Sequence, residues 1–357
     1  MAPAQAATEA GGGFLGGLRR RVTERVAAMP DADAAAWIAG HGMLSMASWA
    51  PLPAGVRERL RDDVRSVVAH NLLAVARFRE VIAALGDLPV CPLKGIHLLD
   101  TVYRDDPGSR PLTDVDLLVP LGTLEEVVER LEGALALQEA PVSRRLPGLY
   151  PDRILADRSF VLELHDRLGY KHGWASSWDD LEPAPGRLHG CSAHLLDRET
   201  TLVHLVTHLV KHAPFSRLVW VEDVLRWVED GEVDPGRALA RARRIGGLRS
   251  FVAGVRALRW LVGESWLPGV PGTVGGLGQR FVVANERRLW AELRREPLPD
   301  PVAAGTSRSR IGSILSALLL ADRPRHAVRI VWIKGAELLR RRARAGGRPA
   351  RAGEAGR

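Results

Sequence analysis

Two aspartates one residue apart, Asp114 and Asp116, lie in the segment Thr-Asp-Val-Asp-Leu-Leu-Val at positions 113–119. Side chains of a β-strand alternate between its two faces, so these carboxylates would share one face and the intervening apolar residues the other. Neighbouring carboxylates repel each other and lose hydration on an apolar strand, and a divalent cation removes both penalties. The alternative is a strand edge on which both aspartates are hydrated.

A second polar pair, Glu163 and His165, occurs in the segment Val-Leu-Glu-Leu-His at positions 161–165 and would also share one strand face. If this strand neighbours the first, the carboxylates of Asp114, Asp116 and Glu163 converge. Such a set can hold one or two Mg²⁺ (or Mn²⁺) ions in nucleotidyl transfer, where metal ions bind the attacking and leaving oxygens. We therefore predict these three acids as metal ligands and catalytic residues. For Glu163 alone, a hydrated strand residue is the alternative.

Basic residues that could bind phosphate lie upstream. Lys94 and Gly95 end a predicted strand and open a helix, where backbone N–H groups bind anions and glycine allows a phosphate close approach. Only four of the 50 basic residues are lysines, so Lys94 is informative; its alternative is an ion pair with an aspartate. Arg110 could bind two triphosphate oxygens, or instead pair with Asp105 or Asp106.

These motifs resemble the uncharacterised nucleotidyltransferase family within the polymerase-beta-like nucleotidyltransferase superfamily. The resemblance rests on LKGIHLLDTVY, GSRPLTDVDLLV and VLELH, and extends over roughly residues 60–230. It implies that Asp114 and Asp116 are the metal-binding pair, that Glu163 is the third carboxylate, and that Lys94 and Gly95 replace the superfamily's usual Gly-Ser turn. It also implies a nucleoside triphosphate substrate.

Three histidines, His204, His208 and His212, lie four residues apart on one face of a predicted helix, with Lys211 beside them. We interpret this face as the acceptor side of the cleft, with His165, Lys211 and His212 as substrate contacts. Helix packing through hydrogen-bonded imidazoles is the alternative, and a zinc site is a weaker one because no HExxH glutamate is present.

A stripe of tryptophans follows this helix. Trp220, Asp223 and Trp227 are three and four residues apart, a spacing typical of a buried helix face. Asp223, the carboxylate within the stripe, is predicted to pair with Lys211 or Arg217.

The elements that would position these residues follow from hydrophobic periodicity. Apolar residues three and four apart predict a helix over 56–85, short strands alternate with helices between 89 and 196, and helices return from 197. The predicted fold class is α+β: a small nucleotidyltransferase core flanked by N-terminal helices and a C-terminal helical bundle. We divide the chain into a flexible leader (1–28), an N-terminal helical region (29–88), the core (89–196), a helical domain (197–339) and a disordered basic tail (340–357).

The composition excludes several classes of protein. Of the 357 residues, 50 are basic and 42 acidic, a formal net charge of +8, but the last 18 residues alone hold seven arginines and one glutamate. The remainder is nearly neutral, so no specific nucleic-acid partner is expected. An apolar content of 46% with two cysteines argues against a disordered chain or a disulfide scaffold. No apolar run is long enough to span a membrane and no secretory signal is evident, so we expect a cytoplasmic protein.

The predicted function is metal-dependent transfer of a nucleoside monophosphate from a nucleoside triphosphate, with ATP as the first candidate, to a hydroxyl of a small-molecule or protein acceptor, with release of pyrophosphate. The expected partners are therefore a nucleotide and an acceptor, without a membrane. The alternative is a catalytically weak binding or regulatory module, such as an antitoxin-like protein, on the same fold.

Overall fold

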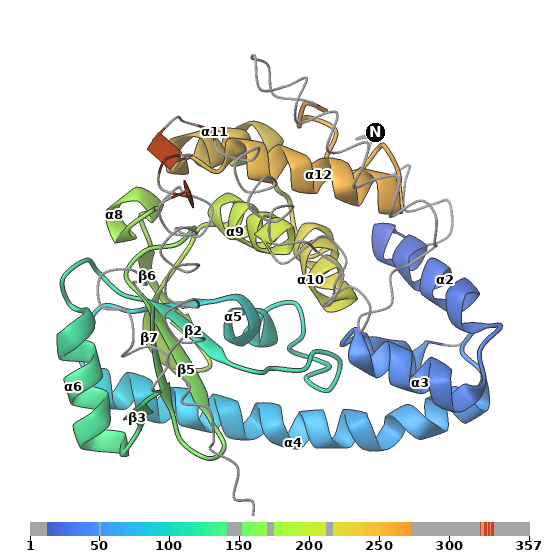
Figure 1. The fold of residues 1–357 in the computed structure, drawn as a ribbon, viewed down its shortest axis with the longest axis horizontal. Coiled ribbons are helices and arrows are strands. Elements are labelled where there is room, and N and C mark those ends of the chain that lie inside the picture. The colour runs from blue at the N-terminus through green and yellow to red at the C-terminus, as the bar shows by residue number, and fades with distance from the viewer. Residues whose placement is uncertain are drawn as a thin grey trace, which may run out of the picture.

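A computed structural model describes residues 13–49, 51–140, 152–169, 175–211 and 217–272, together with 322, 325, 326, 328, 330 and 331. The described residues form a mixed α+β fold in which a small sheet lies between one long helix and a group of C-terminal helices (Figure 1). This confirms the predicted fold class. The predicted tail 340–357 and most of the predicted helical domain beyond residue 272 lie outside the described residues.

The N-terminal part contains α2 (Phe14–Val26), α3 (Asp31–Gly40), the 3₁₀ helix η1 (Leu44–Ser48) and α4 (Ala54–Leu85). The periodicity over 56–85 correctly predicted α4, which ends where Gly86 adopts a φ of 64°. The prediction of a flexible leader over residues 1–28 was wrong at α2, because Leu18, Val22 and Val26 of this helix are buried. Residues spaced four apart form one helical face, and burial of that face fixes the segment.

The main sheet has five strands: β1 (Cys91–Leu93), β2 (Val115–Leu118), β3 (Gln138–Glu139), β4 (Asp152–Ala156) and β5 (Val161–His165). Their order is β1-β2-β5-β4-β3, and β2 and β5 are parallel while the other pairs are antiparallel. Asp116 therefore lies directly opposite Glu163. The alternate residues Leu117, Leu162 and Leu164 are fully buried, which fixes the register because a one-residue slip would turn them to the face that carries Asp116 and Glu163.

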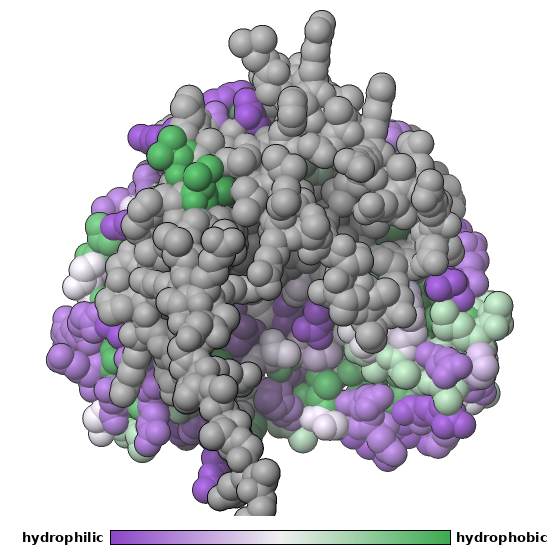
Figure 2. All heavy atoms as spheres, in the orientation of Figure 1, coloured by the Kyte–Doolittle hydropathy of each residue, from purple (hydrophilic) through white to green (hydrophobic). Residues whose placement is uncertain are grey.

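Two helices connect strands of this sheet. The short α5 (Lys94–Asp100) follows β1 directly, and α6 (Leu124–Leu135) follows β2. Helix α6 buries Leu124, Val127, Val128 and Leu131, and hydrophilic side chains gather around it at the lower left of the face in Figure 2. Thr123 takes the N-cap position of α6, but its hydroxyl donates to the carbonyl of Pro120 and does not cap the helix.

A hairpin of β6 (Ala184–Leu188) and β7 (Cys191–Leu195), preceded by the single turn α8 (Trp178–Leu181), packs beside β1. The amide of His194 donates to the carbonyl of Val90 at 2.9 Å and joins the hairpin to the chain entering β1. The sequence pattern did not predict β6, because Pro185 and Gly186 are residues that strands usually avoid.

Four helices follow, as the periodicity predicted: α9 (Arg198–Lys211), α10 (Leu218–Glu229), α11 (Pro235–Ile245) and α12 (Leu248–Val262). Asp234 caps α11 by accepting hydrogen bonds from the amides of Gly236 and Arg237. Helix α12 packs closely on α9, where a Cβ at Gly254 would collide with Val206. Among the described helices, none combines the length and apolarity required to cross a bilayer.

A buried histidine in α5 gives the fold a predicted sensitivity to acid. His97 is 5% exposed and packs edge-on against Trp227, and burial lowers the pKa of its imidazole to about 4, with a further lowering by His189 and an opposing effect of Asp100. The ordinary pKa of a histidine is about 6.5. Between about pH 4 and pH 6.5, His97 is therefore protonated in the unfolded chain but neutral in the folded chain.

We therefore expect the free energy of unfolding to fall by about 3 kcal/mol through this residue as the pH decreases from 6.5 to 4. Urea denaturation at several pH values measures this loss. His97→Gln, which cannot titrate in that range, should unfold with a flatter pH dependence than the parent protein. An equal slope in both proteins would contradict the assignment.

Candidate functional site

The centre of the site is the Asp116 carboxylate on β2, between side chains from β1 and β5. Lys94 follows β1, and its Nζ lies 2.5 Å from Asp116 Oδ1. His165 Nε2 approaches the same oxygen at 2.9 Å, and Glu163 Oε2 lies 3.8 Å from that nitrogen. The pairing of β2 with β5 brings Asp116 and Glu163 together, as expected if the two strands are neighbours, and His165 joins them.

Lys94 takes an unusual backbone conformation at the junction of β1 and α5. Its φ is 47°, in the left-handed region that a residue with a side chain rarely adopts. The strain costs about 1 kcal/mol, and such strained residues concentrate at functional sites. Lys94 takes this conformation where β1 changes directly into α5, and its ammonium group lies against the Asp116 carboxylate. The ion pair corresponds to the alternative reading of Lys94, and a phosphate contact stays a prediction.

Burial and charge act in opposite directions on the three ionisable groups nearest the centre. Burial tends to lower the pKa of Lys94, but Asp116, Asp114 and Glu163 outweigh it and raise this pKa. Burial likewise tends to raise the pKa of Asp116, but Lys94 and His165 hold it well below its usual range. The pKa of Glu163 is raised, first by burial and then by the negative charge of Asp116. Negative charge therefore remains incompletely neutralised at Glu163.

The free oxygens of this cluster fit a cation. One ligand atom each from Asp116, Glu163 and His165 lies within 4.8 Å of the others. Among the described residues, no hydrogen-bond donor reaches Asp116 Oδ2 or the Glu163 carboxylate, whose side chain is 29% exposed. These carboxylate oxygens accept no hydrogen bond from the described residues, and their negative charge is only partly balanced by neighbouring cations. Such oxygens are suitable ligands for Mg²⁺ or Mn²⁺.

Asp114 lies outside this cluster of ligand atoms. Strand β2 begins only at Val115, and the half-exposed Asp114 carboxylate accepts a hydrogen bond from the hydroxyl of Thr113 at 2.9 Å. Its charge still acts on Lys94 and Glu163. Asp114 is thus near the site, and its role as a metal ligand stays a prediction.

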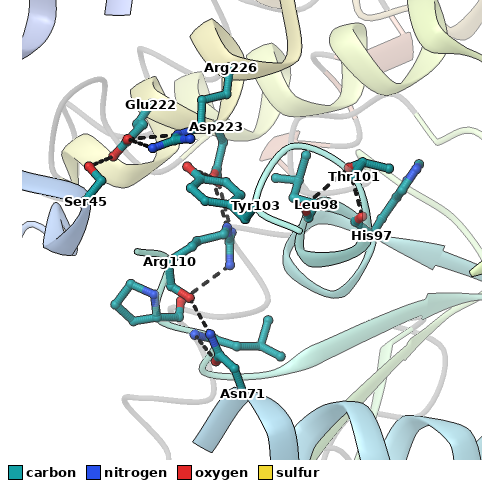
Figure 3. A network of polar contacts seen from close by, with 12 residues as sticks. Ser45, Asn71, His97, Leu98, Thr101, Tyr103, Arg110, Glu222, Asp223 and Arg226 are labelled. Atoms are coloured by element: carbon teal, nitrogen blue, oxygen red, sulfur yellow. Dashed lines mark hydrogen bonds and ion pairs between the residues drawn. The ribbon is translucent and has the colours of Figure 1, made fainter. Parts of the chain in front are cut away.

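Arg110 is committed to a buried ion pair with Asp223 of α10 (Figure 3). Its Nε and Nη2 each lie 2.9 Å from one carboxylate oxygen, and the hydroxyl of Tyr103 donates to the same carboxylate at 3.0 Å. The partner is neither Asp105 nor Asp106, and Asp223 pairs with Arg110 instead of the predicted Lys211 or Arg217. Two parallel hydrogen bonds to one carboxylate leave this guanidinium little freedom to bind a triphosphate.

Gly95 is explained by the same packing. A Cβ at this position would collide with Leu112 Cδ1 and with Arg110 Nη1. The missing side chain therefore makes room for Arg110 and Leu112 under the start of α5. A direct phosphate contact at Gly95 stays a prediction.

Asn71 of α4 fixes the loop that carries Arg110 (Figure 3). The buried Asn71 amide donates to the carbonyls of Pro107 and Arg110 at 2.6 and 2.8 Å, and its oxygen accepts from the amide of Leu112 at 3.2 Å. These three bonds satisfy backbone groups of a loop that has no regular structure. Asn71 thereby positions the chain that enters β2.

We expect Asn71→Ala to lower the free energy of unfolding by about 2–4 kcal/mol, because it leaves buried backbone groups without partners. Chemical denaturation measures the loss. Asn71→Asp keeps the acceptor for Leu112 but loses both donors, so it should also be destabilised. An Asn71→Ala protein as stable as the parent would show that water replaces the amide.

The sequence pattern missed Asn71 and Tyr103 as parts of this network. A signal existed for Asn71, since it is a polar residue within the otherwise apolar positions of α4. No local sequence signal existed for Tyr103, because its partner Asp223 is 120 residues away. The adjacent Glu222 forms a second buried centre that accepts from Ser45 and Arg226, so α10 contributes two neighbouring buried acids (Figure 3).

The histidine face of α9 lies partly within the described structure. The rings of His204 and His208 are 6.4 Å apart, and His208 packs edge-on against Trp220 at 5.2 Å. These contacts agree with the packing alternative for the two histidines. The side chain of Lys211 and all of His212 lie outside the described residues.

Comparison with known proteins supports the resemblance inferred from the motifs. Neither the curated proteins nor the solved structures contain a significant match to this chain. Residues 24–263, about two thirds of the sequence, match the sequence profile of a family described as uncharacterised nucleotidyltransferase. This match includes Lys94, Asp116, Glu163 and His165 with the strands that carry them. The chain belongs to the uncharacterised nucleotidyltransferase family.

Proposed function

We propose that the protein transfers a nucleoside monophosphate from a nucleoside triphosphate, with ATP as the first candidate, to a hydroxyl group of a small-molecule or protein acceptor. The observation that carries the proposal is the register of β2 and β5, which places Asp116 opposite Glu163 beside Lys94. Acids paired in this way hold divalent cations in phosphoryl and nucleotidyl transfer. The family match supports the same class of reaction.

In this mechanism Asp116 and Glu163 would hold the cation, with Asp114 as a further candidate ligand. The cation would supply charge neutralisation for the triphosphate and for the leaving pyrophosphate. His165 holds the Asp116 carboxylate in place through its 2.9 Å contact. Lys94 balances the charge of Asp116 and is close enough to the cluster to contact a phosphate oxygen.

The chemical step joins the acceptor oxygen to the α-phosphorus and breaks the bond from that phosphorus to the oxygen bridging to the β-phosphate. Pyrophosphate leaves with the bonding electrons. Glu163, the more exposed of the two carboxylates, accepts the proton from the acceptor hydroxyl.

The direct test uses the full chain with ATP labelled at the α-phosphate. Binding is measured with Mg²⁺, with Mn²⁺ and with EDTA, and transfer is measured as label incorporated into the protein itself or into components of a cell extract. Metal-dependent binding with label transfer is the expected result. Binding without transfer to any component would favour the regulatory module, and an absence of nucleotide binding in all three conditions would refute the transferase.

Glu163→Gln tests the two proposed roles of this residue together. Loss of the negative charge should weaken metal-dependent nucleotide binding and reduce transfer, while Glu129→Gln, an exposed substitution on α6, should leave both unchanged. If Glu163→Gln transfers label as fast as the parent protein, Glu163 is not the base.

A further inference from the structure

A cavity of about 300 Å³ lies where the starts of β2 and β5 meet α4. Four buried apolar residues form its inner wall: Ala74, Leu112, Val115 and Phe160. Polar side chains from α4, from the chain before β2 and from the turn before β5 complete the lining. Small-molecule sites are concave and mostly apolar with a few polar groups, and this volume is at the lower end of their range. The cavity is therefore suited to a small molecule with an apolar body.

The wall formed by the turn between β4 and β5 is held in place on α4. Arg77 of α4 donates to one oxygen of Asp157 at 2.9 Å and lies 5.9 Å from the ring centre of Phe160. The other oxygen of Asp157 accepts from the amides of Ser159 and Phe160 at 2.7 and 2.8 Å. Both oxygens of this carboxylate are thus engaged within the wall. A wall fixed in this way is ordered before a ligand arrives, which lowers the entropic cost of binding.

The cavity opens beside the proposed catalytic base. Asp114 and Val161 line it, and the register of β2 and β5 places each of them two residues before an acid of the site. Val161 and Glu163 share one partly exposed face of β5 and lie about 7 Å apart along the strand, while Leu162 between them is fully buried. A molecule held in the cavity is therefore within a few ångströms of Glu163.

The proposed phosphate contact lies on the other side of β2. Lys94 follows β1, which pairs with one edge of β2, whereas β5 with Glu163 pairs with the other edge. Among the described residues, those that line the cavity come from α4, from β2 and β5 and from the chain just before these strands, and none comes from β1 or α5. A triphosphate contacted by Lys94 would approach from the β1 side. The β5 side, with the cavity and the base, is left for the acceptor.

We propose that this cavity binds the acceptor, and that the acceptor is a small molecule with an apolar body and a hydroxyl group. The inference rests on the proposed function and chooses between the two acceptor classes named there. The apolar body lies against Leu112, Val115 and Phe160. The hydroxyl extends past Val161 to Glu163, which accepts its proton as the oxygen bonds to the α-phosphorus and pyrophosphate leaves.

Two neighbouring leucines of α4 provide a matched pair of variants. Leu73 lines the cavity and is 44% exposed, whereas Leu72 is 60% exposed and is not part of the lining. Leu73→Trp should therefore narrow the cavity, while Leu72→Trp adds the same ring system outside it. Neither leucine is buried, so both variants should fold. Val161→Phe narrows the cavity from the strand side and serves as an independent second variant.

The assay combines the purified full chain with ATP labelled at the α-phosphate, Mg²⁺ and the small-molecule fraction of a deproteinised cell extract. The parent protein should form a labelled product that passes through a filter retaining protein. Leu73→Trp and Val161→Phe should reduce the rate of this transfer about 10-fold or more and keep the dissociation constant for ATP within about twofold of the parent value. Leu72→Trp should match the parent in both measurements.

Several results would overturn the inference. Transfer unchanged in both cavity variants would show that the acceptor binds elsewhere, and label found only on protein would show that the acceptor is not a small molecule. Loss of ATP binding together with transfer would assign the cavity to the nucleoside instead. A parent protein that binds no ATP, or binds it without any transfer, would refute the proposed function itself.

Discussion

Asp116→Asn is expected to abolish metal-dependent nucleotide binding and to reduce transfer by about 10³-fold or more. The substitution keeps the size of the side chain but removes the charge that binds the cation and balances Lys94 at 2.5 Å. A metal ion contributes several kcal/mol to the stabilisation of charge in the transition state, and about 4 kcal/mol corresponds to this factor. Binding assays with labelled ATP at increasing Mg²⁺ concentration measure the first effect, and single-turnover label transfer measures the second.

A control is required because Asp116→Asn also leaves the Lys94 ammonium without its carboxylate. Removing one member of a buried ion pair costs about 3–5 kcal/mol, so the variant should be less stable as well as inactive. The double variant Lys94→Met/Asp116→Asn removes the unpaired charge and should recover much of the stability while nucleotide binding stays lost. Asp105→Asn, an exposed substitution in the loop before β2, should change neither property. Nucleotide binding by Asp116→Asn with the parent's metal dependence would refute the assigned site.

Asp223→Asn is expected to lower the free energy of unfolding by about 3–5 kcal/mol, because it leaves the buried Arg110 guanidinium uncompensated. Tyr103 also loses the charged acceptor of its hydrogen bond. Arg110 belongs to the loop that enters β2, so the same change should weaken nucleotide binding by moving Asp114 and Asp116. Urea denaturation and nucleotide titration of the same preparation measure the two effects.

A double-mutant cycle separates the ion pair from its surroundings. Arg110→Met, Asp223→Leu and the two together are compared by denaturation. The double variant should be more stable than the Asp223→Leu single variant, because two apolar side chains leave no unpaired buried charge. Strictly additive losses would show that Arg110 and Asp223 stabilise the fold independently, in spite of their two 2.9 Å contacts.

Local periodicity determined much of this protein from the sequence alone. The spacing of apolar residues predicted α4, and the alternation along two short strands predicted that Asp116 would share a face with Glu163 once those strands paired. Such patterns can be read because each depends on the geometry of a single helix or strand. The motifs at residues 93–119 and 161–165 also identified the family correctly. The same local reasoning was wrong for α2, where the burial of every fourth residue in a Gly- and Arg-rich segment was overlooked.

Only the tertiary structure decided which charged groups are paired and which remain available. Arg110 has acidic residues within five positions in the sequence, yet it pairs with Asp223, 113 residues away. Nothing local indicates that choice, because a charged side chain is neutralised by whichever partner the packing of helices brings to it, and burial makes the pairing obligatory. The packing of α10 against the loop before β2 thus assigned Arg110 to the architecture of the site. The sequence determined the acids of the site, and the fold determined their counter-charges.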